Sequence, residues 1–437
     1  MVRKMRFYAE RGDRVEVFLP YGGKYLSFEI PKRNLLAVLE PSKIPGARSS
    51  EEIRQKTLKA LENPIGTKKL SELVKRGDKV VIVADDNTRP TPTKDLIPPL
   101  LDKLNEAGIL DEDITIVIAL GTHRYMTKEE ILEKFGKEVV ERVEIINHEW
   151  MDPKNLVYIG GSSKGTPIIV NKIVYEADFK IGVGNIVPHH IPGYAGGGKI
   201  VAPGISSPET VASFHMLSVR SRRHWLGIPR NPVRDLIDEI ARKTGVHTIL
   251  NTTLNADKEV VGVFFGDLQE AWLKGVESAR EIYGVKSPGK ADIVVASSYP
   301  CELEFWQAHK ALYPADIVVK DGGTIIIVSP CPEGVAVTHP EVLELTQKEP
   351  EEIDRAVNLG EVKDVVAASL AIAWGKVRRR ADIILVSEGI SEEETEKLGF
   401  KYAETIDEAL KMAFKKHGDN ARIVAIPHGC DTLPILE

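Results

Sequence analysis

Short runs of apolar residues alternate along most of the chain with longer amphipathic segments. The runs at 79–84, 114–120 and 179–183 have the length and β-branched content of buried strands. The segments between and after them have helical periodicity, and we expect helices at 93–107, 127–136, 207–218, 231–243 and 268–283. Strands that alternate with helices in this way are typical of βαβ units, which build parallel sheets. The pattern therefore predicts an α/β fold.

A second alternating series begins near 291–296, after the breaker-rich stretch 284–289. It predicts strands at 316–320, 324–329, 382–387 and 422–426, and helices at 303–312, 340–347, 351–358, 362–374, 391–397 and 406–416. Residues 1–30 alternate charged and β-forming residues around a Gly-Gly turn, which predicts a hairpin-like opening. We expect two doubly wound, Rossmann-like domains with a cleft between them, at 1–285 and 290–437. The last residues are free to return to the first domain.

Length and composition agree with this division. A chain of 437 residues is too long for one ordinary core, and 43% hydrophobic with 28% charged residues is typical of folded globular domains. The formal net charge is −6, and no long run of either sign dominates. This distribution gives no broad attraction for nucleic acid or anionic lipid, so we expect a small molecule as the partner.

The cysteines and the N-terminus indicate the compartment. Cys301, Cys331 and Cys430 are odd in number and widely spaced, which argues against a disulfide framework and for reducing surroundings. The first twenty residues are interrupted by charges too often for a signal peptide, and no apolar stretch is long enough to span a membrane. We therefore expect a cytoplasmic protein without a membrane segment.

Three polar loops follow predicted strands, at 85–92, 121–124 and 185–199. In open parallel sheets, ligands bind outside the carboxyl ends of the strands, where such loops leave the sheet. The edge that these loops share is therefore the candidate active site.

The third loop contains Gly193 and Lys199 in the spacing of a phosphate-binding loop, G-x-x-x-x-G-K. The match then fails, because Ile200 stands where Ser or Thr would hold magnesium and Pro203 interrupts any following helix. An ordinary nucleotide triphosphatase is thus disfavoured. Two interpretations remain: a flexible glycine turn with a solvated lysine, and a lysine that a bulky ligand approaches closely.

Four histidines, His123, His189, His190 and His215, lie within 93 residues, in or just after these loops. Each alone is more often a structural or surface residue than a ligand. Four near one sheet edge favour metal binding or proton transfer, because imidazole titrates near neutral pH and is the commonest metal ligand. The spacing is not H-E-x-x-H, so a conventional hydrolase would have to assemble its site from separate loops.

Other candidate contacts lie in the first loop and in the second domain. Arg89 suits a carboxylate or phosphate, although an ion pair with Asp86 that merely shapes the turn is an alternative. Trp306, Gln307 and Lys310 fall on the first helix predicted after the strand near 291–296, where Trp306 and Lys310 share a face. Core packing explains Trp306 as well as substrate contact does.

In combination these motifs resemble the lactate racemase family, enzymes that use a nickel-pincer nucleotide. Their order and spacing cover about 230 residues. The motifs are D-x-T-R-P at Asp86–Pro90, G-T-H-R at Gly121–Arg124, Pro188-His189 followed ten residues later by Lys199, His215 sixteen residues beyond that lysine, and Q-x-x-K at Gln307–Lys310.

The resemblance implies roles for individual residues. Lys199 would form the covalent link to the cofactor, pyridinium-3,5-bisthiocarboxylic acid mononucleotide with nickel, and His215 would ligate the nickel. The two general acid/base residues would be His123 and His189, with His190 left open as the alternative to His189. Further cofactor contacts are implied at Asp86, Gly196 and Gly197, and substrate contacts at Arg89, Trp306, Gln307 and Lys310.

The implied enzyme is an isomerase that racemises or epimerises C2 of a 2-hydroxy acid, by hydride transfer to and from the cofactor. The chain departs from the lactate enzymes at Trp306, where they usually have tyrosine, and at Gly198, where arginine is often found. Lactate or another short acid and a sugar acid of the gluconate type are therefore both candidate substrates. Proteins that build the cofactor are implied partners, and the oligomeric state is left open.

Two functions from other classes are also kept. A metal-dependent hydrolase could use the same histidines, and a non-catalytic nucleotide-binding protein would explain the glycine-rich loop. The second leaves His123 and His189 without a role.

Overall fold

The computed structural model of the chain describes residues 7–437, and the contacts within it form two compact units. Unit 1 comprises Met1–Ser42, Arg222–Leu226 and Tyr283–Glu437, and unit 2 comprises Lys43–Ser221 and Gly227–Ile282. The sequence pattern assigned 1–285 to one domain, whereas the described N-terminal residues group with the C-terminal part. Positions 1–6 of the predicted opening hairpin lie outside the described residues.

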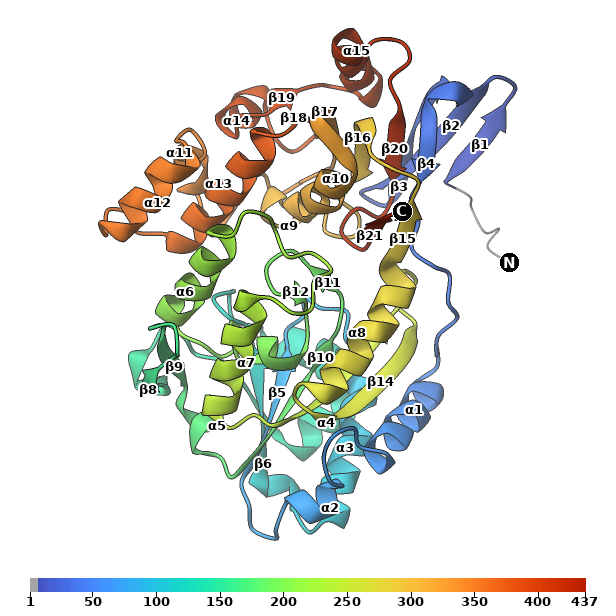
Figure 1. Ribbon diagram of the computed structural model, residues 1–437. Helices are drawn as coiled ribbons and strands as arrows, with labels where there is room; N and C mark the ends of the chain where they lie inside the picture. Colours follow the sequence, from blue (N-terminus) through green and yellow to red (C-terminus); the bar gives the residue numbers. More distant parts are fainter. Residues whose placement is uncertain (1–6) are drawn as a thin grey trace. The chain divides into compact units, whose positions relative to one another are not determined.

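Unit 2 is built on a six-stranded sheet in the order β14-β13-β10-β5-β6-β7 (Figure 1). All neighbours are parallel except β14, which is antiparallel to β13. Between β5 and β10 the chain order reverses, and ligands of open sheets bind at the carboxyl ends of strands at such a reversal. The strands are β5 (Val80–Asp85), β6 (Ile114–Ala119), β7 (Glu144–Asn147), β10 (Phe179–Asn185), β13 (Thr248–Leu254) and β14 (Val260–Asp267).

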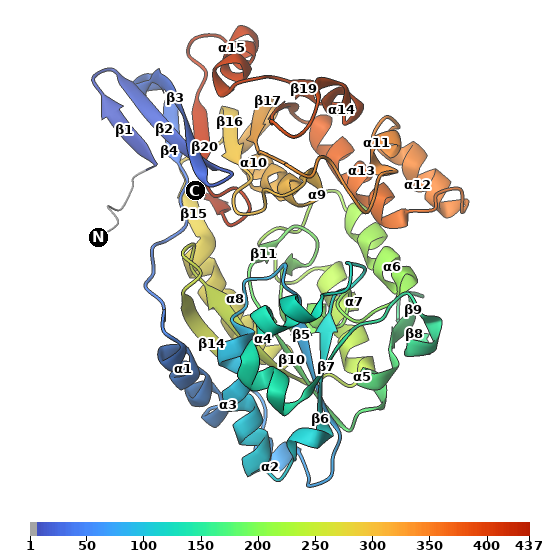
Figure 2. The same cartoon turned by 180° about the vertical axis from the view of Figure 1, so that it is seen from behind.

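Helices cover both faces of this sheet. Figure 1 shows α7 and α8 over one face of the sheet. Figure 2, the view from behind, shows α3 and α4 over the other face. The elements are α1 (Ser50–Glu62), α2 (Leu70–Leu73), α3 (Thr93–Glu106), α4 (Lys128–Arg142), α5 (Lys172–Glu176), α6 (Pro208–Val219), α7 (Pro232–Thr244), α8 (Glu270–Tyr283), η2 (Asp111–Asp113), η3 (Pro153–Asn155) and η4 (Gly197–Ile200). Two small sheets complete the unit, β8 (Leu156–Gly161) with β9 (Pro167–Asn171) and β11 (Pro188–His189) with β12 (Gly193–Tyr194).

The helix expected at 231–243 is confirmed as α7. Asn231 caps the helix, and its Oδ1 accepts hydrogen bonds from the backbone N–H groups of Val233 (3.1 Å) and Arg234 (2.9 Å). Pro232 occupies the first turn, where its missing N–H is no loss. The cap fixes the direction in which α7 leaves the preceding loop, which matters for the site described below.

Unit 1 contains a second six-stranded sheet, in the order β19-β18-β17-β16-β20-β4, with all neighbours parallel. Its chain order reverses between β16 and β20. The strands are β4 (Leu35–Val38), β16 (Ala291–Ser297), β17 (Val319–Val328), β18 (Asp382–Val386), β19 (Lys401–Tyr402) and β20 (Ile423–Ile426). The other elements are β1 (Tyr8–Arg11), β2 (Arg14–Tyr21), β3 (Lys24–Pro31), β15 (Gly284–Ser287), β21 (Leu433–Leu436), η1 (Lys32–Asn34), α9 (Phe305–Ala308), η5 (His309–Ala311), α10 (Leu312–Val318), α11 (Val342–Leu345), α12 (Pro350–Asn358), α13 (Val365–Arg378), α14 (Glu392–Lys397) and α15 (Ile406–His417).

Two interactions place the N-terminal segment in unit 1. Strand β4 adds to the edge of the sheet by parallel pairing with β20. The antiparallel sheet β1-β2-β3 buries Val15, Val17 and Leu19 in the same core as Ile293 and Ile326. Both pairings join parts of the chain that are far apart in sequence, so local periodicity gave no sign of them.

The strand predicted at 316–320 is wrong. Residues Leu312–Val318 form helix α10, and β17 begins only at Val319. A short apolar run such as this one fits a buried helix as well as a strand, and periodicity alone does not separate the two. Pro314 falls within the first turn of α10, where proline is tolerated.

At the level of class, the α/β prediction is confirmed, because both units combine parallel sheets with helices. Within residues 7–437, no helix has both the length and the apolar character needed to cross a membrane.

A buried histidine connects two parts of unit 2 that the sequence analysis did not join. His148, which follows β7, is fully buried. Its Nε2 donates to the carbonyl of Ser206, and its Nδ1 accepts from Asn171 Nδ2, each at 3.2 Å. Burial lowers the pKa of His148 to about 4, although the Ser206 carbonyl opposes this shift. The ring is thus a neutral link between β7, β9 and the segment that leads into α6.

This link predicts a pH-dependent loss of stability. Between about pH 6.5 and about pH 4, His148 binds a proton in the unfolded chain but not in the folded one. The folded state therefore loses stability as pH falls through this window, by up to about 3 kcal/mol from this residue, and keeps its full contribution above it. Urea unfolding of the wild type and of His148→Gln at pH 7.5, 5.5 and 4.5 measures the effect. Equal pH dependence in the two proteins would contradict the prediction.

Candidate active site

The loop that follows β5 is held from beneath by a buried lysine. Lys134, on α4, donates through Nζ to the carbonyls of Arg89 (2.7 Å) and Thr91 (3.0 Å). It also lies 3.3 Å from Asp85 Oδ1, while the Thr91 hydroxyl donates to Asp85 Oδ2 at 2.5 Å. Burial raises the pKa of Asp85, and Lys134 counteracts that shift. The loop therefore has a fixed backbone at the sheet edge.

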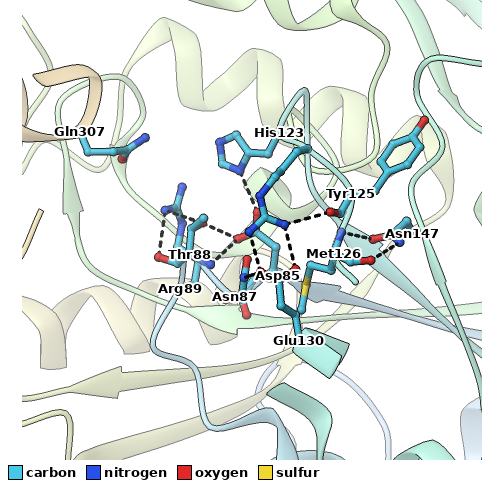
Figure 3. Close-up of polar contacts among 12 residues, drawn as sticks. Asp85, Asn87, Thr88, Arg89, His123, Tyr125, Met126, Glu130, Asn147 and Gln307 are labelled. Carbon is cyan, nitrogen blue, oxygen red and sulfur yellow. Dashed lines mark hydrogen bonds and ion pairs between the residues drawn. The ribbon is translucent and has the colours of Figure 1, made fainter. Parts of the chain in front are cut away.

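A chain of hydrogen bonds runs along this loop to the first predicted acid/base histidine (Figure 3). The Arg89 guanidinium donates to the Thr88 hydroxyl at 3.1 Å, and that hydroxyl donates to Asp86 Oδ1. The other carboxylate oxygen of Asp86 lies 2.8 Å from His123 Nδ1. The direct Asp86–Arg89 ion pair considered for this turn is replaced by a contact through Thr88.

The charge of Asp86 decides which nitrogen of His123 carries the proton. Burial alone would raise the pKa of Asp86, but the hydrogen bond from His123 and the nearby Arg89 outweigh burial and lower it. An ionised carboxylate can only accept, so His123 Nδ1 donates to it. In the neutral ring, Nε2 is then the unprotonated nitrogen, as in a Ser-His-Asp triad. His123 is therefore arranged as a base.

The second predicted acid/base histidine has the opposite arrangement. His189 ends the short strand β11, and its Nδ1 accepts a hydrogen bond from the backbone N–H of Ile191 at 3.2 Å. The proton of the neutral ring consequently lies on Nε2. His190 stacks against it, with ring centroids 4.7 Å apart and an interplanar angle of 14°. His190 is buried and His189 is partly exposed, which favours His189 over His190 as the acid/base group.

The glycines before Lys199 are explained by the packing of the loop itself. Gly196 and Gly197 have positive φ angles of 74° and 58°, a region that other residues rarely adopt. A Cβ atom at Gly196 would lie 2.6 Å from Ile186 Cγ1, and one at Gly198 would lie 2.8 Å from Asp238 Oδ1. The backbone of the loop is thus tightly packed against neighbouring side chains, which disfavours the interpretation of this loop as a flexible turn.

A buried arginine that the sequence analysis missed fastens this loop. Arg234, on α7, donates to the carbonyls of Tyr194 and, at 3.1 Å, of Gly196. Its guanidinium lies 4.1 Å from the ring centre of Trp272, whose Nε1 donates to the carbonyl of Ala195 at 2.8 Å. The sequence contained a signal for this pair, because Arg234 and Asp238 are charged residues four positions apart on the apolar face of α7.

Lys199 and His215 lie on consecutive elements. Lys199 is in η4 and His215 is in α6, and both side chains are partly buried. Helix α6 is capped by Ser207, whose backbone N–H donates to the carbonyl of Ile169 at 2.9 Å. A primary amine suits a covalent cofactor link, and an imidazole suits nickel. The donor set therefore fits the group that the resemblance implies.

Within residues 7–437, no three His, Cys, Asp or Glu side chains gather closely enough to hold a metal ion. The expected single protein ligand at His215 requires no such cluster.

In unit 1, the predicted substrate residues form their own contacts. Lys310 Nζ donates to Gln307 Oε1 at 2.5 Å and lies 4.0 Å from Cys301 Sγ. Trp306 stacks on His339, with ring centroids 4.0 Å apart and an interplanar angle of 12°. The expected helix 303–312 is divided here into α9, which carries Trp306 and Gln307, and the 3-10 turn η5, which carries Lys310.

Comparison with known proteins identifies the family. The family description "Lactate racemase N-terminal domain" matches residues 21–227, and "Lactate racemase C-terminal domain" matches residues 286–433. The chain belongs to the lactate racemase family. Members of this family are isomerases of the racemase type, and this assignment applies to the chain.

Individual relatives cover almost the whole chain. Lactate racemases of Lactiplantibacillus plantarum and Thermoanaerobacterium thermosaccharolyticum are each 30% identical over 421 residues, 95% of this chain and 98% of theirs. The structure of the lactate racemase apoprotein from T. thermosaccharolyticum matches with a TM-score of 0.85 and 29% identity, covering 96% of this chain and 100% of that one. A Thermotoga maritima crystal structure, 23% identical, covers 90% of this chain and 99% of its own with a TM-score of 0.68, which shows the fold alone.

The arginine beneath the glycine-rich loop gives a stability prediction. Arg234→Met keeps a long apolar stem but leaves two carbonyls and the buried Asp238 carboxylate without their partner. Breaking a buried charged pair by removing one partner costs about 3 to 5 kcal/mol, so unfolding in urea should occur at much lower denaturant concentration. Arg242→Met, on the exposed side of the same helix, is the matched control and should change stability by less than about 1 kcal/mol. Similar losses in the two variants would contradict the assigned role.

Proposed function

We propose that this member of the lactate racemase family inverts C2 of a 2-hydroxy acid, with lactate as the first substrate to test. The observation that carries the proposal is the pair of oppositely protonated histidines, His123 fixed by Asp86 and His189 fixed by Ile191. Inversion requires hydrogen to leave one face of the carbon and return to the other. Histidines serve the accompanying transfer of the proton on the C2 hydroxyl group.

The protein's own part in the reaction is proton transfer and orientation. His123 Nε2 takes the proton of the substrate hydroxyl, and the ionised Asp86 stabilises the imidazolium that results. His189, in its imidazolium form, returns a proton from Nε2 to the oxygen when the opposite enantiomer forms, and a neutral ring is left. Both histidines exchange roles in the reverse direction, because the reaction converts each enantiomer into the other.

Arg89 is proposed to hold the substrate carboxylate. Its backbone is fixed by Lys134, and its guanidinium has only a neutral partner, Thr88, among the hydrogen bonds described above. A guanidinium whose hydrogen bonds go to a neutral hydroxyl can still bind a carboxylate from outside. Gln307 and Lys310 remain predicted substrate contacts in unit 1.

Lys199 and His215 are the residues proposed to hold the nickel-pincer nucleotide, through an amine link and a nickel ligand respectively. When bound, this group supplies the hydride acceptor for the hydrogen on C2. Gly196 and Gly197 remain predicted contacts of the cofactor. Both carboxylate oxygens of Asp86 are engaged by Thr88 and His123, so we propose that Asp86 acts mainly as a positioning residue.

A sugar acid of the gluconate type is the second candidate substrate. The observation that favours it is Trp306 in unit 1, which stacks on His339. Trp306 stands where the lactate enzymes usually have tyrosine. An indole face packs well against the C–H groups of a polyhydroxy chain. Side-by-side rates with lactate and with gluconate decide between the two.

The central test is the state of Lys199. We expect the chain, co-expressed with cofactor-synthesis proteins, to carry a nucleotide-sized added mass on the Lys199 peptide and to interconvert D- and L-lactate or the two C2 epimers of a sugar acid. Lys199→Ala should lose both the added mass and the activity, and His215→Ala should lose nickel by elemental analysis. Lys172→Ala, at the start of the exposed helix α5, is the control and should keep all three. Full activity of Lys199→Ala would refute the proposal.

The positioning role of Asp86 gives a separate prediction. Asp86→Asn removes the charge that holds the proton on His123 Nδ1, and loss of the corresponding aspartate in a serine-protease triad lowers kcat by about 10⁴-fold. We expect a fall of at least about 10²-fold in kcat with the nucleotide retained on Lys199. Asp257→Asn, in the turn between β13 and β14, should leave kcat unchanged. A kcat for Asp86→Asn equal to that of the wild type would show that His123 needs no orienting carboxylate.

A further inference from the structure

The three cysteines of the chain gather at one edge of the unit 1 sheet. Cys301, Cys331 and Cys430 follow β16, β17 and β20, which are neighbours in the sheet. Cys301 and Cys430 follow the two strands between which the chain order reverses. Ligands of open parallel sheets bind at this position, and none of the roles assigned above uses these thiols.

Backbone hydrogen bonds keep the segments that carry Cys301 and Cys430 side by side. The N–H groups of Gly429 and Cys430 donate to the carbonyls of Ser297 (2.9 Å) and Tyr299 (3.3 Å). The Ser298 carbonyl accepts from both cysteines, from Cys301 N at 2.8 Å and from Cys430 Sγ at 3.0 Å. Cys301 also contributes to the raised pKa of Cys430, so the two side chains are close enough to interact. The two segments therefore hold the thiols near one another in the folded chain.

The surroundings give the two thiols different reactivity. The Lys310 ammonium group lies 4.0 Å from Cys301 Sγ, and a neighbouring positive charge favours the reactive thiolate. Burial, followed by the contact with Cys301, raises the pKa of Cys430 well above its ordinary value. Cys301 and Cys430 are both partly exposed and so are accessible to a small oxidant. Cys301 is placed to react first, and Cys430 is placed to react with the product.

The third cysteine provides an internal contrast. Cys331 is fully buried, and its Sγ lies 3.1 Å from the Ser329 hydroxyl. Burial raises the pKa of Cys331 to about 12. A buried, protonated thiol of this kind is inert towards oxidants.

We propose that Cys301 and Cys430 form a redox-active pair that closes to a disulfide when the protein meets a hydroperoxide. The Cys301 thiolate attacks the peroxide, forms a sulfenic acid and releases hydroxide. The Cys430 sulfur then displaces the hydroxyl of the sulfenic acid, and its proton leaves with that hydroxyl as water. In total, two thiols lose two electrons to one peroxide, and reduction by a dithiol restores them.

The disulfide has a consequence for Lys310, and this part rests on the proposed function. Lys310 Nζ contacts Cys301 Sγ and Gln307 Oε1. Oxidation of Cys301 removes the first of these contacts and leaves the second. A changed Lys310 position would raise KM for the 2-hydroxy acid several-fold, with recovery after dithiothreitol. Cys301→Ser should show no change in KM on peroxide treatment.

The disulfide itself is tested on the full chain without cofactor. After hydrogen peroxide treatment, intact-protein mass should fall by about 2 Da, and a tryptic digest should join the Cys301 and Cys430 peptides. The number of free thiols found by titration should fall from three to one. Cys301→Ser and Cys430→Ser should each prevent the cross-link. Cys331→Ala is the matched control and should retain it.

Three outcomes would overturn the pair. These are oxidation of Cys301 to sulfinic acid without a cross-link, a disulfide between two chains, and a cross-link that includes Cys331. None of them bears on Lys199, so failure here is distinguishable from failure of the proposed function. A disulfide that forms with unchanged KM would overturn the connection to Lys310 alone.

Discussion

The arrangement of the unit 2 site depends on one buried guanidinium. Arg234 holds the carbonyls of Tyr194 and Gly196, and the adjoining Gly193, Gly196 and Gly197 adopt conformations that other residues rarely adopt. Tyr194 in turn pairs with Pro188 in the short sheet β11-β12, which ends at His189. The positions of Lys199 and of His189 therefore both follow from the same buried charge. A buried arginine is costly unless it is paired, and here two backbone carbonyls and Asp238 accept from its terminal NH groups.

The second constraint is electrostatic and concerns proton placement. Asp86 is buried yet ionised, because His123 and the nearby Arg89 offset the penalty of burial. Its charge gives His123 a tautomer opposite to that of His189, which is set by a backbone N–H. In the neutral rings, Nε2 of His123 is unprotonated and can accept the proton of a substrate hydroxyl, whereas Nε2 of His189 carries a proton. The geometry of single loops thus sets the tautomers of the two histidines that we propose as the acid/base pair.

The sequence predicted those parts of the molecule that local patterns determine. The parallel strands, the Asn231 cap and the loops that carry Asp86 and His123 all follow from periodicity, capping and turn chemistry. It failed at the ambiguous apolar run 316–320, whose first residues lie in helix α10. It also failed where distant segments decide, as in the pairing of β4 with β20. Arg234 and His148 were missed for the same reason, because they act on loops that belong to other elements.

The pairing of distant strands also changes how the three cysteines are interpreted. An odd number of widely spaced cysteines argues against a structural disulfide framework, and that argument is sound for the folding of the chain. It does not address two thiols that the fold itself brings together. Cys301 and Cys430 meet because parallel strands β16 and β20 are neighbours, although a long stretch of sequence separates them. The carboxyl ends of neighbouring parallel strands, which commonly assemble ligand sites, can therefore also assemble a reversible thiol pair. The positive charge of Lys310 beside Cys301 is the feature that favours a reactive thiolate here.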